Sequence, residues 1–184
     1  MPATGQRWTH LVRFLAVEDG NTYFGQVGSE AYPDVGLAAW KGEKIAANVL
    51  SGSWEDGVVT DQILHVSKLL SPIPSTQVPI VLCMGLNYRD HAAEAKMPVP
   101  ETPILFIKPR SAISGPFPEP ILIPRIAQDG TSDYEAELAI VMGMTGKDIS
   151  LEDAMNFVLG FTCANDVSAR KLQFTNGQWC FSKG

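Results

Sequence analysis

Two glutamates lie two residues apart in the segment Asp133–Met142, which reads DYEAELAIVM. If this segment is a β-strand, Glu135 and Glu137 point to the same face, because side chains alternate along a strand. Two like charges on one side of an apolar element are costly unless water or a cation meets them. A hard divalent cation with oxygen ligands meets that need. The alternative is a solvated strand edge, but the apolar run Leu138–Met142 indicates a buried strand and makes a ligand pair equally plausible.

A third carboxylate, Asp166, follows the apolar segment Phe161–Ala164, which we expect to be a strand. Taken alone, Asp166 suits the N-cap of a helix that opens at Ser168 better than it suits a metal ligand. Together with Glu135 and Glu137 it makes a set of three carboxylates with room for water. Such a set suits Mg²⁺ better than Ca²⁺ or Zn²⁺.

His91 and Glu94 lie three residues apart in Arg89–Lys96, a segment with good helix formers in its middle. This spacing places both side chains on one helix face, where the carboxylate orients the ring and raises its basicity. Such a pair suits a general base acting on water, although alone it is more often a histidine and a glutamate in solvent. Here it follows a turn, Gly85–Tyr88, at a strand end, where α/β proteins commonly bind ligands. The flanking prolines of Met97–Pro100 indicate a short segment that could act as a lid.

Three cations lie near the ends of expected strands or helices: Lys108, Arg170 and Lys183. Each could be a solvated surface charge, which is the commonest environment of lysine and arginine. The functional alternative is an ion pair with an anionic substrate, bidentate in the case of arginine. Tyr88 and Gln173 could donate hydrogen bonds to substrate oxygens or have structural roles.

The alternation of short strands and helices predicts a mixed α/β (α+β) fold. The expected strands are Leu11–Val17, Thr22–Val27, Ile80–Met84, Pro103–Ile107, Tyr134–Met142 and Gly160–Ala164. The expected helices are Leu37–Leu50, Arg89–Lys96, a segment through Phe157 opened by a Ser150–Asp153 capping box, and Ser168–Phe174. A proline-rich linker, Ser71–Ser75, separates a small N-terminal domain, residues 1–74, from a second domain, residues 75–184.

The composition, 45% hydrophobic and 18% charged in 184 residues, is that of a soluble globular protein. A net charge of −6 without a basic stripe argues against a nucleic-acid partner, and no apolar run approaches the roughly 20 residues that span a membrane. Three cysteines without framework spacing, and an N-terminus without a signal-peptide core, indicate a cytoplasmic protein. Cys83 and Cys163 lie in apolar runs and are expected to be inert core residues. No G-x-G-x-x-G follows a strand, which excludes a dinucleotide enzyme.

Five ordered segments together resemble the fumarylacetoacetate hydrolase family. They are Gly85-Leu86-Asn87-Tyr88-x-x-His91-x-x-Glu94, Pro103-Ile104-Leu105-Phe106-Ile107-Lys108, Asp133-Tyr134-Glu135-x-Glu137-Leu138, Asn165-Asp166-Val167-Ser168-Ala169-Arg170-x-x-Gln173 and Trp179-x-x-Ser182-Lys183-Gly184. The resemblance runs from about Leu69 to the last residue. Leu11–Phe14 is similar to the opening strand of the small leading domain of that family.

This resemblance implies Glu135, Glu137 and Asp166 as ligands of Mg²⁺ or Mn²⁺. It implies His91 and Glu94 as a water-activating dyad on a mobile lid. Lys183 resembles the lysine of the family that approaches the substrate and the metal. Three further positions are similar to substrate-contacting ones: Lys108, Arg170 and Gln173.

The implied reaction is hydrolysis of a C–C bond in a β-diketo or acylpyruvate-type acid through a metal-bound enolate. A decarboxylase or an isomerase of a 2-oxo acid such as oxaloacetate would use the same charged groups, so both stay open. The intact pair His91 and Glu94 favours the hydrolase, although such a pair also serves proton transfer.

Family members continue past the Lys183 motif with strands that close a mixed β-roll. We therefore expect a C-terminally truncated chain with an incomplete roll, in which an open sheet edge and apolar surface invite aggregation or pairing with another chain. A homodimer is possible, since members of the family are usually dimers. An inactive truncated member of the family is the non-catalytic alternative.

Overall fold

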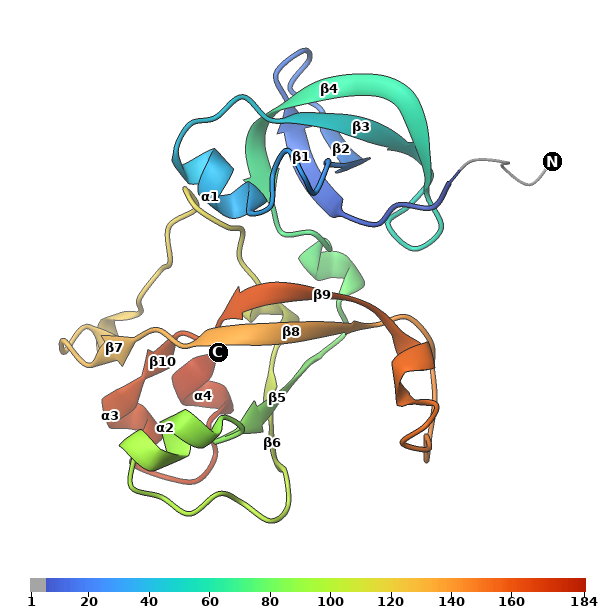
Figure 1. Ribbon diagram of the computed structural model, residues 1–184. Coiled ribbons are helices and arrows are strands. Elements are labelled where there is room, and N and C mark those ends of the chain that lie inside the picture. The colour runs from blue at the N-terminus through green and yellow to red at the C-terminus, as the bar shows by residue number, and fades with distance from the viewer. Residues whose placement is uncertain (1–5) are drawn as a thin grey trace. The chain divides into compact units, whose positions relative to one another are not determined.

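The computed structural model describes residues 6–184, and these form two compact units (Figure 1). The first unit contains residues 6–79 and also Arg110–Ile121, and the second contains Ile80–Pro109 and Leu122–Gly184. The sequence predicts two domains that meet at residue 74, and that domain boundary stays a prediction. No helix within residues 6–184 has the length and apolar character needed to cross a membrane.

Four antiparallel strands close into a barrel in the first unit. They are β1 (Leu11–Ala16), β2 (Thr22–Gln26), β3 (Ala46–Ser51) and β4 (Val58–Leu70), and β4 pairs with both β1 and β3. The strands predicted from Leu11 and from Thr22 are confirmed. Gly20 joins them with a φ of 72°, a left-handed conformation that glycine adopts without steric cost.

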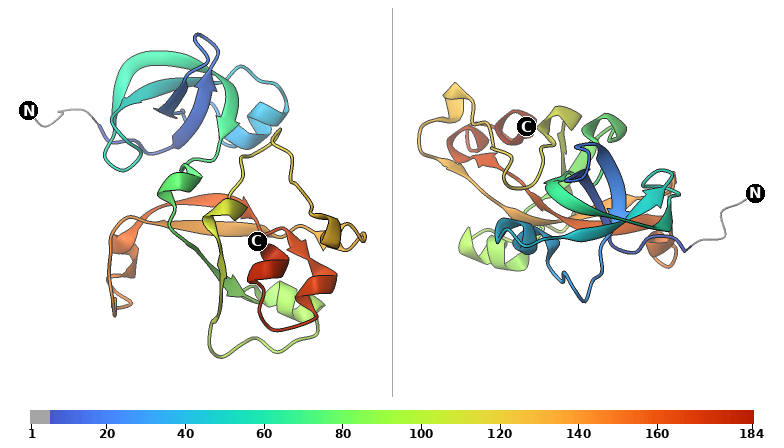
Figure 2. Two further views of the ribbon diagram at one scale, coloured as in Figure 1. Left: turned by 180° about the vertical axis from the view of Figure 1, so that it is seen from behind. Right: turned by 90° about the horizontal axis from the view of Figure 1, so that it is seen from above.

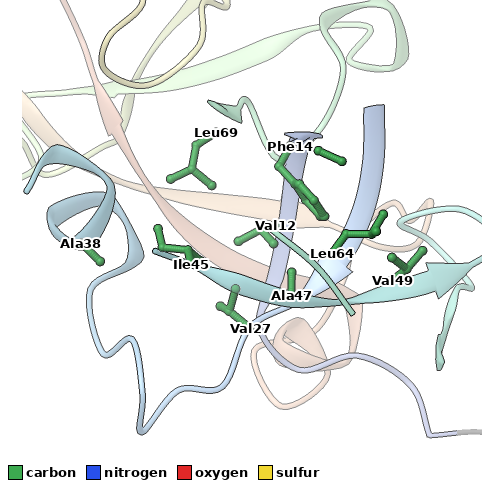
Figure 3. Packing of buried hydrophobic residues seen from close by; sticks show 10 residues of the cluster. Val12, Phe14, Val27, Ala38, Ile45, Ala47, Val49, Leu64 and Leu69 are labelled. Atoms are coloured by element: carbon green, nitrogen blue, oxygen red, sulfur yellow. The ribbon is translucent and has the colours of Figure 1, made fainter. Parts of the chain in front are cut away.

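The barrel interior holds the apolar core of this unit (Figure 3). Every second residue of β1 is buried, and the Phe14 side chain at its centre is fully enclosed. A Cβ atom on Gly25 would lie 2.9 Å from the Phe14 ring and 3.0 Å from the Asn48 carbonyl oxygen. Glycine at position 25 therefore lets β2 approach the ring. The core cluster consists of Val12, Phe14, Ala16, Val27, Ala38, Ile45, Ala47, Val49, Leu64 and Leu69.

The predicted helix Leu37–Leu50 is wrong over most of its length. Helix α1 covers only Val35–Trp40, and it begins where the Asp34 side chain accepts a hydrogen bond of 2.8 Å from the Leu37 N–H. Gly42 then takes a φ of 73°, which ends the helix, and the following residues form β3. Tertiary pairing with β2 and β4 overrides the modest helix propensity of this segment.

The second unit contains three separate two-stranded antiparallel sheets (Figures 1 and 2). They are β5 (Val81–Gly85) with β6 (Ile104–Lys108), β7 (Ser132–Asp133) with β10 (Ser168–Ala169), and β8 (Ala136–Met142) with β9 (Val158–Asn165). The helices are α2 (Arg89–Glu94), α3 (Arg170–Gln173) and α4 (Cys180–Lys183). Single 3₁₀ turns cover Arg125–Ala127 and Ala154–Phe157 in this unit, and Ser75–Gln77 and Arg110–Ala112 in the first unit. The mixed α/β class is confirmed, with strands outnumbering the short helices.

Strand β8 is not buried as its apolar run suggested. Its large apolar residues Leu138, Ile140 and Met142 are 58%, 54% and 53% exposed, while the alternating side chains of Glu137, Ala139 and Val141 are half-buried. Periodicity fixes which residues share a face, but the neighbouring elements decide which face is covered.

Three smaller expectations also need correction. Cys163 is exposed and Cys83 is only partly covered, so neither is a core residue. The Ser150 hydroxyl does accept a hydrogen bond of 3.2 Å from the Asp153 N–H, but only a 3₁₀ turn follows. The segment predicted as a helix from Ser168 first pairs as β10 and becomes helical at Arg170.

We predict that Phe14→Ala lowers the free energy of unfolding by about 3–5 kcal/mol, because it leaves a cavity in a closed barrel. Urea denaturation measures this loss. Val17→Ala, at a 64% exposed position just past β1, is the control and should stay within about 0.5 kcal/mol of the parent chain. A loss in the Phe14 variant no larger than in the control contradicts the packing described for the barrel.

Candidate active site

The pairing of β8 with β9 places the three predicted carboxylates at neighbouring backbone positions. Their ladder places Ala136 opposite Asn165, and it continues past the strand end through a 2.9 Å hydrogen bond from the Asp166 N–H to the Glu135 carbonyl oxygen. Glu137 lies one position inside the ladder, opposite Ala164. Residues far apart in the sequence therefore meet because two strands share a register.

The Lys183 ammonium lies between two of these carboxylates. Its Nζ atom is 2.8 Å from Glu135 Oε2, 2.9 Å from Asp166 Oδ2 and 2.6 Å from Ser168 Oγ. An ammonium has three N–H donors, and here each meets one acceptor. The residue is only 4% exposed, and Nζ lies 5.5 Å from the centre of the Phe106 ring.

Asp166 also pairs with a second cation, which lies beside its other carboxylate oxygen. Lys108 Nζ lies 2.8 Å from Asp166 Oδ1, while its hydrogen bond goes to the Lys183 carbonyl oxygen. The buried Oδ1 is therefore in an ion pair with Lys108, although within residues 6–184 no hydrogen bond of good geometry reaches it. Two ammonium groups thus neutralise Asp166, one at each carboxylate oxygen.

Arg170 joins two acidic side chains at the start of α3. Its Nη2 lies 2.8 Å from Asp133 Oδ2, and its Nη1 pairs with Glu135. Gln173 Oε1 accepts a 3.1 Å hydrogen bond from the same Nη1 and so orients the guanidinium. Burial alone would raise the pKa of Glu135, but the hydrogen bonds from Lys183 and Arg170 outweigh it and lower that pKa.

Glu137 has the opposite electrostatic environment. Burial, the largest effect, raises the pKa of this carboxyl; the hydrogen bond with Tyr88 lowers it, and the weaker effects of the charges on Glu135 and Asp166 raise it. Within residues 6–184, Glu137 takes part in none of the salt bridges that the other two carboxylates make. It is a half-buried acid that lacks a cation.

The Tyr88 hydroxyl accepts a 3.1 Å hydrogen bond from the Leu138 N–H and also hydrogen-bonds to Glu137. Tyr88 is the N-cap residue of α2, so this hydroxyl links the start of that helix to β8. His91 and Glu94 lie exposed on α2, and in the described part of the chain neither side chain makes a hydrogen bond or ion pair. Their role as a dyad stays a prediction.

The structure decides two alternatives that the sequence left open. Asp166 does not cap a helix, because the N-cap residue of α3 is Ala169 and the side chain that accepts from the first turn, at the Lys171 N–H, is that of Thr131. Lys108, Arg170 and Lys183 are not solvated surface charges, since each is paired with a carboxylate inside the cluster.

Two members of the cluster were missed in the sequence, Asp133 and Ser168. Strand alternation supplies the missing signal for Ser168, because a residue two positions after Asp166 in an extended segment points to the same side. Asp133 stands opposite Ser168 in the β7–β10 ladder, and no local pattern reveals that pairing.

The donor set fits a hard divalent cation. Within residues 6–184, no three His, Cys, Asp or Glu side chains are gathered as a metal cluster, and Lys183 stands between two of the carboxylates. However, all three candidates offer only oxygen, and among residues 6–184 Glu137 takes part in no salt bridge. Oxygen donors of this kind are those that Mg²⁺ and Mn²⁺ prefer.

Comparison with known proteins places residues 80–184 in a family model described as fumarylacetoacetate (FAA) hydrolase C-terminal. The chain is 41% identical over 191 residues to the caffeoylpyruvate hydrolase of Neonothopanus nambi, covering 100% of this chain and 65% of that protein. It is 46% identical over 123 residues to the mitochondrial oxaloacetate tautomerase FAHD2A of Homo sapiens, covering 66% of this chain and 38% of that protein.

A solved structure shares the architecture. The 2-hydroxyhepta-2,4-diene-1,7-dioate isomerase from Mycobacterium marinum aligns with a TM-score of 0.71 and 31% sequence identity. The alignment covers 95% of this chain and 60% of that chain. The chain thus spans less than two thirds of the length of each of these three relatives.

We predict that Glu137→Gln stabilises the chain at pH 7 when a chelator removes divalent cations. The pKa of Glu137 in the folded state is raised above its ordinary 4.5. As pH rises from 4.5 to the raised pKa, the folded state therefore keeps a proton that the unfolded state has lost. Stability therefore falls as pH rises, and the glutamine variant avoids that loss. We expect its Tm to rise by about 1–3 °C at pH 7 and the gain to vanish below about pH 4.

Glu135→Gln is the matched control, because the same substitution there removes a carboxylate whose pKa is lowered by Lys183 and Arg170. It should lower the Tm at pH 7. If both variants shift the Tm in the same direction, the electrostatic difference between the two glutamates is wrong.

Proposed function

Because the chain belongs to the fumarylacetoacetate hydrolase family, we propose that it hydrolyses a C–C bond in a β-diketo or acylpyruvate-type acid with the help of a divalent cation. The observation that supports this proposal is the placement of Glu135, Glu137 and Asp166 at one end of the β8–β9 pair, beside three cationic side chains. Acidic oxygens suit a metal ion, and the surrounding positive charge suits a substrate that carries a carboxylate.

Glu135, Glu137 and Asp166 would hold the cation. Members of the family generally use a divalent metal, and we propose Mg²⁺ or Mn²⁺ here. When bound, such an ion acts as a Lewis acid that polarises a carbonyl oxygen. A cation held there would also neutralise the charge of Glu137, whose ionised form is disfavoured by burial and by the neighbouring carboxylates.

The cations of the cluster would bind the anionic parts of the substrate. Arg170 offers a planar guanidinium that Gln173 orients, and Lys108 adds a second positive charge. Lys183 would stabilise negative charge that develops on the departing fragment. These groups now neutralise acidic side chains, so substrate binding exchanges one set of ion pairs for another.

His91, assisted by Glu94, would take a proton from water as the water oxygen attacks the substrate carbonyl. The C–C bond then breaks, and its electron pair passes to the departing fragment as an enolate. Protonation of that fragment completes the hydrolysis. Both side chains are exposed on α2, so this step requires the helix to bring them toward the substrate.

The second candidate is tautomerisation, isomerisation or decarboxylation of a 2-oxo acid such as oxaloacetate. The 46% identity to an oxaloacetate tautomerase and the structural similarity to an isomerase support it. In these reactions no water attacks, and a proton or CO₂ leaves the same carbon framework. We also propose that the protein is cytoplasmic and forms a homodimer. Neither property distinguishes the hydrolase from the second candidate.

We predict that the purified chain binds Mg²⁺ or Mn²⁺ in calorimetry and that Asp166→Asn weakens the affinity by at least about tenfold. Glu152→Gln changes an exposed acid of the same unit and is the control, which should leave the affinity unchanged. No binding to the parent chain, or equal binding to both variants, removes the cation from the proposal.

We predict that His91→Ala lowers kcat for acylpyruvate hydrolysis by about 10²–10⁴-fold with a smaller effect on KM. Pyruvate release reports hydrolysis, and the loss of enol absorbance or the release of CO₂ from oxaloacetate reports the second candidate. His10→Ala, an exposed histidine of the first unit, is the control. Hydrolysis that survives unchanged in the His91 variant shows that this residue does not activate water.

A further inference from the structure

Ser168 is the one fully buried polar side chain of the cluster that the proposed reaction does not use. Its Oγ lies 2.6 Å from Lys183 Nζ and 3.0 Å from the carbonyl oxygen of Asp166. Side chains of serine are mostly exposed, so complete burial with two partners calls for a specific role.

The hydrogens of these groups can be assigned by counting. A serine hydroxyl has one proton, and that proton goes to the Asp166 carbonyl oxygen, which can only accept. The Ser168 oxygen must therefore accept from Lys183. The ammonium in turn donates one proton each to Ser168, Glu135 and Asp166.

The three acceptors of Lys183 are not equivalent. Glu135 and Asp166 are two of the carboxylates that would coordinate a divalent cation, and rotation of each carboxylate would direct its oxygens toward that cation. Ser168 carries no charge and is a poorer ligand for such an ion. It is the acceptor that would stay with the lysine once the carboxylates are engaged elsewhere.

The backbone holds Ser168 firmly enough for this task. Its strand β10 pairs with β7, where Ser168 stands opposite Asp133, and Asp133 is itself bound to Arg170. Lys183, by contrast, extends four methylenes from α4, a helix of only four residues. A long side chain on so short an element needs fixed acceptors, because its rotamers are many.

We infer that Ser168 is a positioning residue that holds the Lys183 ammonium in the site when substrate and cation occupy the carboxylates. This inference rests on the proposed function, since it assigns Lys183 a role beside the substrate. Ser168 acts through the lysine and need not touch the substrate.

The test follows the ζ-amino signal of Lys183 in ¹⁵N-labelled full chain by NMR, with chelator and then with Mg²⁺. The signal is assigned by its absence in Lys183→Arg. An ammonium with three buried hydrogen bonds exchanges its protons slowly, so we expect a visible signal in the parent chain. In Ser168→Ala the exchange rate should rise at least about tenfold, and more steeply after Mg²⁺ is added.

Ser182→Ala is the matched control. Ser182 is also buried, stands next to Lys183 on α4, and donates a 3.2 Å hydrogen bond to the Trp179 carbonyl oxygen instead of contacting Nζ. Its loss should leave the exchange rate unchanged. An unchanged rate in Ser168→Ala, or an equal rise in Ser182→Ala, overturns the inference.

Two further variants keep the test decisive if Ser168→Ala fails to fold. Ser168→Cys keeps a similar volume with a weak sulfur acceptor and should also speed the exchange, and Ser168→Thr keeps the hydroxyl and should restore slow exchange. In turnover, Ser168→Ala should lower kcat at least about tenfold with KM nearly unchanged. If the parent chain turns over no substrate, the proposed function fails while the NMR comparison still tests Ser168.

Discussion

The site depends on the electrostatic balance around one buried ammonium, that of Lys183. Placing this charge out of water is costly unless every N–H donor meets an acceptor. Two carboxylates and one hydroxyl meet that condition, at distances between 2.6 and 2.9 Å. The same carboxylates would repel each other without the lysine. The lysine therefore offsets the cost of burying the carboxylates, and the carboxylates offset the cost of burying the lysine. These ion pairs also help to order the short strands and helices that carry the charged side chains.

The second unit is built around these charges more than around an apolar core. Its buried residues include Asp166, Ser168, Ser182 and Lys183, whereas the barrel of the first unit buries almost only aliphatic and aromatic groups. Apolar packing tolerates small shifts, but hydrogen bonds to charged groups are directional. The ladders of β7 with β10 and β8 with β9 supply the necessary precision, because backbone register fixes the side chains that extend from them.

The sequence predicts the local part of this arrangement well. Alternation places Glu135 and Glu137 on one side, and the strands around them are confirmed. It does not predict the partners, because Lys183 lies 48 positions from Glu135 and no local pattern carries that distance. The same limit explains β3, where pairing with two strands outweighs helix propensity, and the exposed face of β8. Propensity and period are properties of a segment, whereas coverage and charge pairing are properties of the fold.

The hydroxyl of Tyr88 links α2 to the carboxylate cluster. It joins the N-cap residue of that helix to the backbone of Leu138 and to Glu137. A hydrogen bond of this kind contributes about 1 kcal/mol net, and the burial of Ala92 adds apolar packing to what holds the helix. The position of α2 is therefore coupled to the ionisation of Glu137, because the hydroxyl at its start also hydrogen-bonds to that carboxyl.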